Sequence, residues 1–106
     1  MKTNNLSRNI PGFFRDEVFE KLLSTEHFKL ERILSRGHRT AEGQWYEQEK
    51  NEWVMIFQGS AVLRIEGEEQ LLTLTKGDYV LLPARLRHRV EKTDEGEETI
   101  WLALHF

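Results

Sequence analysis

The sequence contains no cysteine among its 106 residues. This absence excludes disulfides, a thiolate nucleophile and every zinc or iron–sulfur site that is built on cysteine. A bound metal would therefore need histidine, carboxylate, amide or phenol ligands. Because the chain has only four histidines, any metal chemistry would rest on few imidazoles and mostly on oxygen donors.

Long hydrophobic runs and an excess of positive charge are also missing. No apolar run is longer than that of residues 53–57, whereas a membrane-spanning helix needs roughly 20 residues. The N-terminus has no apolar segment of the kind found in a signal peptide, and the formal net charge is −3, which argues against general nucleic-acid binding. We therefore expect a cytoplasmic protein that binds neither membranes nor nucleic acid.

The length predicts one domain with one core. We divide it into an N-terminal lead-in, residues 1–27, and a main body, residues 28–106. Residues 16–23 are predicted to form a short helix, because apolar residues lie on one stripe and Asp16 and Glu17 suit the positive end of the helix dipole. The stripe consists of Phe14, Val18, Phe19 and Leu22.

From Phe28 onward the pattern favours strands. Residues 61–66 alternate apolar and polar, which is typical of a half-buried strand. Glycine-containing turns separate this segment from further strands at residues 70–75, 79–82 and 99–106. Short strands with such turns predict an all-β, antiparallel sandwich or barrel.

The strand around residues 53–57 is apolar on both faces. Trp53, Met55 and Phe57 share one face, and Val54 and Ile56 share the other with Glu52. The barrel interior can cover only one of these faces. The short helix or a second subunit must cover the other, and we expect a homodimer.

Two segments carry a family resemblance. Glu52 is followed after six residues by Gly59, and Gly77 is followed after five residues by Pro83 and later by His88. These spacings resemble the two motifs of the cupin superfamily, and residues 45–48 and 52–54 are similar to small single-domain bacterial cupins. The resemblance covers residues 37–106. It implies an antiparallel jelly-roll β-barrel, often with one divalent metal inside.

The chain departs from the family motifs at several positions. Tyr46 and Gln48 occupy the places of the two histidines of the first motif, whereas Glu52 and His88 match the other two ligand positions. Arg85 replaces the glycine of the second motif. The resemblance thus implies a metal set of Gln48, Glu52 and His88 for a zinc, manganese, iron or nickel ion.

Other polar residues near the motifs have alternative interpretations. His38 could supply a further imidazole ligand or lie in a solvated loop. Tyr46 and Arg85 are candidate substrate-binding residues, although Arg85 could instead pair with Glu47 or Glu49. His105 lies on the same strand face as Trp101 and Ala103, and we interpret that face as pointing outward or into an interface.

The shared strand face of Tyr46, Gln48 and Glu52 predicts a polar cluster with His88 inside an apolar barrel. A carboxylate at a core-facing position is costly unless it is paired or binds a cation. Glu52 and His88 are therefore candidate catalytic residues, either with a metal or as a metal-free acid–base pair. They could also form a purely structural network.

Three functions are compatible with these features. The first is a cupin whose pocket binds a metal, a small polar or anionic molecule, or both; as an enzyme, it would be a metal-assisted isomerase or dioxygenase. The second is a small-ligand sensor without catalysis. The third is a structural barrel that acts through protein contacts. The sequence does not select a reaction.

Overall fold

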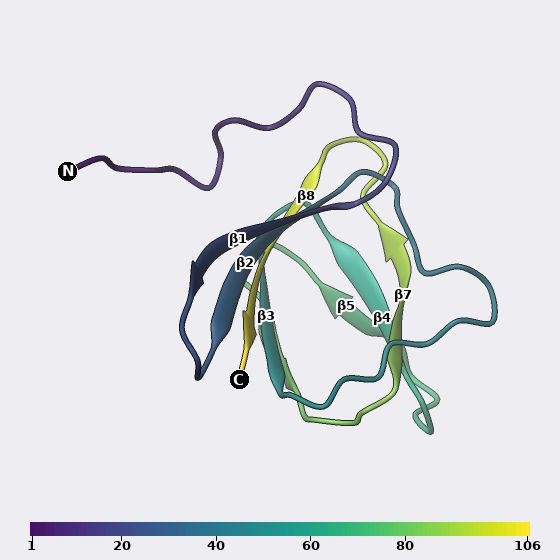
Figure 1. Ribbon diagram of the computed structural model, residues 1–106. Helices are drawn as coiled ribbons and strands as arrows, with labels where there is room; N and C mark the ends of the chain where they lie inside the picture. Colours follow the sequence, from purple (N-terminus) through teal and green to yellow (C-terminus); the bar gives the residue numbers. More distant parts are fainter.

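A computed structural model describes residues 1–106 as two antiparallel β-sheets packed face to face (Figure 1). The larger sheet has the strand order β1-β2-β8-β3-β6, and the smaller has the order β5-β4-β7. Their bounds are β1 Val18–Ser24, β2 Lys29–Ser35, β3 Glu52–Gln58, β4 Ala61–Ile65, β5 Leu72–Leu74, β6 Tyr79–Leu82, β7 His88–Thr93 and β8 Thr99–His105. The predicted all-β barrel is confirmed.

The predicted N-terminal helix is wrong: most of the segment forms strand β1. It pairs with β2 from Val18, opposite Leu34, to Ser24, opposite Lys29, with one irregularity after Lys21. A helix of about two turns is marginal without tertiary contacts, whereas the open edge of β2 offers hydrogen-bond partners along its whole length. The structure contains no helix that could cross a membrane.

The core lies between the two sheets. Alternate residues of β3 and β4 are buried there, which matches the predicted alternation of residues 61–66 and the predicted shared face of Glu52, Val54 and Ile56. Ten buried apolar side chains form one cluster: Ile33, Val54, Ile56, Ala61, Leu63, Ile65, Leu74, Leu82, Trp101 and Ala103. At about 25 cal/mol per Å² of buried apolar surface, such a cluster is the main stabilising term of the fold.

The long connection between β2 and β3 runs beside β7. Thr40 binds Val90 twice, because its N–H donates to the Val90 carbonyl at 2.9 Å and its hydroxyl accepts from the Val90 N–H at 2.9 Å. Further along, Tyr46 and His88 exchange two backbone hydrogen bonds. This connection therefore extends the smaller sheet and places Tyr46 and Gln48 at the barrel mouth.

The outer face of the larger sheet remains partly uncovered. Trp53 on β3 stacks at a tilt against Tyr79 on β6, with 5.4 Å between the ring centres. Tyr79 and Leu81 are 66% and 50% exposed. Because β1 joins the edge of this sheet rather than packing on its face, it does not cover the apolar side of β3.

Candidate functional site

The site begins with one row of residues across the larger sheet. Glu52 is the direct partner of His105 on β8 and of Leu82 on β6, and His105 is the direct partner of Lys29 on β2. Directly opposed residues of antiparallel strands present their side chains to the same face. The pairing register therefore brings a carboxylate and an imidazole together on the inner face.

The smaller sheet contributes His88 from the start of β7. Its Nδ1–H donates to the Leu86 carbonyl at 3.0 Å, which leaves Nε2 directed at Glu52. Tyr46 lies directly opposite His88, and the two rings stack with 5.8 Å between their centres. His88 is thus held by its backbone, by a carbonyl and by an aromatic ring.

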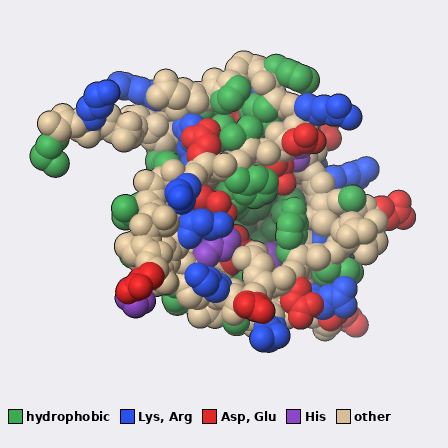
Figure 2. Space-filling view, viewed as in Figure 1, with side chains coloured by type: hydrophobic (Ala, Val, Ile, Leu, Met, Phe, Trp, Pro, Cys, Tyr) green, Lys and Arg blue, Asp and Glu red, His purple; other side chains and the backbone are tan.

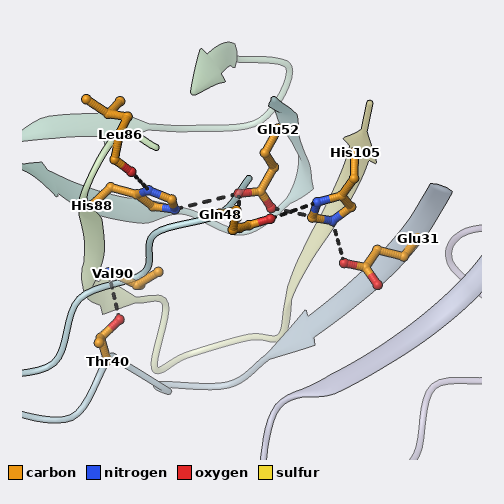
Figure 3. Close-up of polar contacts among 8 residues, drawn as sticks. All are labelled: Glu31, Thr40, Gln48, Glu52, Leu86, His88, Val90 and His105. Carbon is orange, nitrogen blue, oxygen red and sulfur yellow. Dashed lines mark hydrogen bonds and ion pairs between the residues drawn. The ribbon is translucent and has the colours of Figure 1, made fainter. Parts of the chain in front are cut away.

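Five polar side chains form a continuous chain across the barrel (Figure 3). His88 Nε2 lies 3.6 Å from Glu52 Oε1, and the Gln48 amide N–H donates to the same oxygen at 3.1 Å. His105 Nδ1 lies 3.1 Å from Gln48 Oε1, and His105 Nε2 lies 2.8 Å from Glu31 Oε1, both within hydrogen-bond distance. Every buried polar group of this chain has a partner, as low-dielectric interiors require.

The environment shifts the pKa of His88. Burial by itself lowers this pKa, because desolvation disfavours the imidazolium form. Contact with Glu52, the bond to the Leu86 carbonyl and the charge of Glu52 outweigh burial, so the net pKa of His88 is raised above its ordinary value. The imidazolium form consequently persists to higher pH than in a solvated histidine.

The chain of polar groups lines a cavity of about 320 Å³. The remaining walls are mainly apolar and include Ile33, Val54, Leu63, Val90 and Trp101. Figure 2 shows hydrophobic side chains inside a hollow bordered by acidic, basic and histidine side chains. This volume lies at the lower end of the range for small-molecule sites, about 300–1,000 Å³.

The donor set does not fit a resident divalent metal. Gln48, Glu52 and His88 do meet at the cavity, but no group of three or more histidine, aspartate or glutamate side chains is arranged to hold an ion. Both amide atoms of Gln48 and both ring nitrogens of His105 are already hydrogen-bonded within the chain of polar groups. Only Glu52 and His88 Nε2 remain, whereas a zinc site needs three or four protein ligands.

Two predicted residues lie away from the cavity. His38 accepts from the Arg36 N–H through Nδ1, and its Nε2 donates to the Arg15 carbonyl at 2.7 Å, so both ring nitrogens are engaged elsewhere. Arg85 is exposed and does not line the cavity. Its guanidinium forms no ion pair with Glu47 or Glu49 either. The backbone N–H of Arg85 donates to the Gln48 carbonyl at 2.6 Å.

The prediction that His105 points outward or into an interface is wrong. Its side chain is buried and lines the cavity together with Trp101. The alternation along β8 was ambiguous, because both faces of this strand are apolar and only pairing with Glu52 assigns them. Glu31 was missed as well. The sequence gives only a weak signal for it, because four of the seven residues of β2 are polar or charged and Glu31 does not stand out among them.

Comparison with known proteins agrees with this architecture. Residues 34–105 match the Cupin domain family. A Ralstonia eutropha JMP134 protein, provisionally described as a mannose-6-phosphate isomerase, superposes with a TM-score of 0.95 at 42% identity and covers 99% of this chain and 97% of its own. No curated protein matched the chain.

More distant structures share the fold alone. An RmlC-like cupin family protein from Methanocaldococcus jannaschii, with a double-stranded β-helix fold, has a TM-score of 0.72 at 18% identity over 99% of this chain and 89% of its own. A cupin superfamily protein from Desulfitobacterium hafniense has a TM-score of 0.73 at 16% identity over 92% and 83%. The chain belongs to the cupin family, which confirms the resemblance in its motifs.

Proposed function

We propose that this cupin binds a small organic molecule in its cavity and that Glu52 and His88 transfer a proton on it. The observation that carries the proposal is the 3.6 Å contact between Glu52 Oε1 and His88 Nε2 at the wall of an apolar cavity of about 320 Å³. A carboxylate and an imidazole at such a distance can act as base and acid on one bound molecule.

The surroundings suit the two groups to these roles. The raised pKa of His88 increases the fraction of imidazolium near neutral pH, so His88 serves as the proton donor. Glu52 accepts a hydrogen bond from Gln48, which orients its carboxylate as the proton acceptor. The Leu86 carbonyl accepts a hydrogen bond from His88 Nδ1 and so orients the imidazole. The mainly apolar walls lower the polarity around the two groups, which strengthens both interactions.

Proton transfer beside a carbonyl group is the reaction class that this pair serves best. It needs one base and one acid beside the bound molecule, and it does not need the missing metal ligands. The description of the Ralstonia relative as an isomerase is in keeping with this class. The reaction would be an isomerisation of a small hydroxy-carbonyl compound.

Hydrogen exchange in D₂O tests the proposal directly. Small hydroxy-aldehydes and hydroxy-ketones are incubated with the protein and EDTA, and loss of the C–H signal beside the carbonyl is followed by NMR. We expect exchange by the wild type and a loss of about 10²–10⁴-fold in Glu52→Gln and His88→Gln. Glu68→Gln, an exposed turn residue, is the matched control and should retain full activity.

Three outcomes would contradict the proposal. Equal exchange by the wild type and both variants would remove Glu52 and His88 from the reaction. Activity abolished by EDTA and restored by zinc or manganese would assign the chemistry to a divalent metal. Stabilisation by a compound without any exchange would indicate a binding module, since binding to the native state alone raises stability.

A further inference from the structure

The carboxylate of Glu52 lies between two imidazoles (Figure 3). His88 Nε2 is 3.6 Å from Glu52 Oε1, and His105 Nε2 is 3.7 Å from Glu52 Oε2. The proposed acid–base pair uses only the first of these contacts. It leaves a buried histidine beside the base without a role, and the hydrogen bonds of His105 indicate what that role is.

The hydrogen bonds of Gln48 assign one ring hydrogen of His105. An ionised carboxylate only accepts, so the Gln48 amide presents its N–H to Glu52 Oε1 and its oxygen to His105 Nδ1, each at 3.1 Å. An amide oxygen also only accepts, and Nδ1 is therefore the donor in the second bond. In the neutral form of His105 that satisfies this bond, Nε2 is bare.

This Nε2 atom lies between two carboxylates. It is 2.8 Å from Glu31 Oε1 and 3.7 Å from Glu52 Oε2. A nitrogen and a carboxylate oxygen at 2.8 Å need one hydrogen between them, which either atom can hold. His105 and Glu31 therefore share one ionisable hydrogen, and a movement of about 0.5–1 Å would bring Glu52 into hydrogen-bond distance of the same nitrogen.

The pairing register continues this path to the edge of the barrel. Glu52 on β3 is the direct partner of His105 on β8, which is the direct partner of Lys29 on β2. Glu31 lies two residues after Lys29 on the same strand face, and its Oε2 is 3.7 Å from Lys29 Nζ. The Lys29 side chain is 46% exposed. One row of side chains thus leads from Glu52 to an exposed ammonium group.

We propose that His105 and Glu31 form a proton relay for Glu52: they accept the proton that Glu52 removes from the bound molecule and pass it to water beside Lys29. The inference rests on the proposed function, because it concerns the proton that Glu52 takes up there. His105 and Glu31 act through Glu52, so they are positioning residues in this reaction. The row of side chains lets the proton leave while the bound molecule stays in place.

Each step of the relay moves one proton and changes no oxidation state. Glu52 takes a proton from the carbon beside the carbonyl group, and His88 gives its proton to the carbonyl oxygen, which leaves a neutral enediol. The Nε2–H bond of His105 breaks as an O–H bond forms on Glu31, and the freed Nε2 then accepts the proton of Glu52. Glu31 releases its proton to water. Glu52 and His105 are restored while the enediol is still bound.

The fate of a labelled hydrogen tests the relay. Glyceraldehyde with deuterium at C2 is incubated with the protein and EDTA in H₂O, and ²H NMR compares the deuterium transferred to dihydroxyacetone with that released to water. Without the relay, Glu52 keeps the deuteron and returns it to the neighbouring carbon. We expect the wild type to release most of the label, and His105→Gln and Glu31→Gln each to lower the ratio of release to transfer roughly tenfold.

This ratio separates a relay from a structural role. A variant that merely displaces Glu52 would slow release and transfer equally, and the ratio would stay the same. Glu26→Gln makes the same change in net charge as Glu31→Gln at an exposed position in the β1–β2 turn. This control should leave both the ratio and the rate unchanged.

A second measurement needs no substrate. The ¹⁵N chemical shifts of an imidazole distinguish a nitrogen that carries a hydrogen from a bare one. We expect Nδ1 of His105 to carry a hydrogen in the wild type. Glu31→Gln removes the partner with which Nε2 shares its hydrogen, so it should change the Nε2 signal of His105 and leave that of His88, which Glu31 does not contact, unchanged.

The outcomes separate the relay from the proposed function. An unchanged ratio in His105→Gln and Glu31→Gln, or transfer without release in the wild type, would overturn the relay and leave Glu52 and His88 as the acid–base pair. A bare Nδ1 on His105 would also overturn it, because the ring could then give up its Nε2 hydrogen only by becoming an anion. Label neither transferred nor released by the wild type would overturn both proposals.

Discussion

Arg85 adopts a backbone conformation that normally belongs to glycine. Its φ is +69°, in the left-handed region where a side chain costs about 1–2 kcal/mol. The cupin motif places a glycine at this position, and the local geometry gives the reason. The backbone N–H of Arg85 binds the Gln48 carbonyl, so the turn must keep this conformation whichever residue occupies it.

Replacing Arg85 by glycine should therefore stabilise the protein. We expect Arg85→Gly to raise the free energy of unfolding by about 0.5–1 kcal/mol, because relief of strain exceeds the greater chain entropy of glycine. Urea denaturation measures the change. Arg85→Ala keeps the Cβ and should differ from the wild type by less than about 0.5 kcal/mol. A glycine variant less stable than the alanine variant would contradict this explanation.

The charge state of His88 should make stability depend on pH. Because the folded-state pKa of His88 is raised, its interaction with Glu52 stabilises the fold fully below the unfolded pKa of about 6.5 and is lost as pH rises through the folded pKa. We expect the stability advantage of the wild type over His88→Gln to be larger at pH 5.5 than at pH 8.5. Urea denaturation at both values provides the measurement, and an advantage that grows with pH would contradict the assignment.

The turn between β3 and β4 depends on the absence of a side chain at Gly59. Its φ is +82°, and a Cβ there would lie 2.6 Å from Thr99 Oγ1 and 2.8 Å from Thr99 Cα. Thr99 is fully buried at the start of β8, so it cannot move away easily. The turn thus lets β3 and β8 approach closely.

Two alanine substitutions separate backbone strain from this close approach. Gly67 has a similar φ of +87° but no atom within 4 Å of the added Cβ. We expect Gly67→Ala to cost about 1–2 kcal/mol from strain alone, and Gly59→Ala to cost a further 1–3 kcal/mol, roughly, from overpacking. Thermal and urea unfolding measure both. Equal costs would show that β8 yields to the added methyl group.

At the scale of the whole molecule, the uncovered outer face of the larger sheet needs an explanation. Its apolar side chains include Trp53, Tyr79 and Leu81. The Tyr79 side chain is more than half exposed, and that of Leu81 is half exposed. The helix that could have covered this face does not exist, because its residues form β1 at the sheet edge. Of the two covers expected for this face, only the second subunit remains.

We propose that a second copy of the chain packs on this face. Light scattering at tens of micromolar should give the mass of a homodimer, and Leu81→Glu should shift the protein to a monomer, because it places a charge in an apolar interface. Leu71→Glu changes an equally exposed leucine in the segment before β5, away from this face, and should leave the dimer intact. A monomeric wild type would contradict the proposal.

By itself, the sequence determined the strand alternation, the barrel class and the meeting of Glu52 with His88. Alternation of apolar residues is a local property, and the motif spacings around Gly59, Gly77 and Pro83 carry the family resemblance along one stretch of chain. These features need no knowledge of which strand pairs with which.

Only the tertiary structure decided that residues 18–24 form an edge strand, that His105 points inward and that Glu31 lines the cavity. Residues 16–23 were periodic enough for a helix, but the free edge of β2 offered them hydrogen bonds. Both faces of β8 are apolar, so its orientation depends on its register with Glu52, about fifty residues earlier in the chain. Such pairings depend on contacts between distant segments, and a single strand read alone does not contain them.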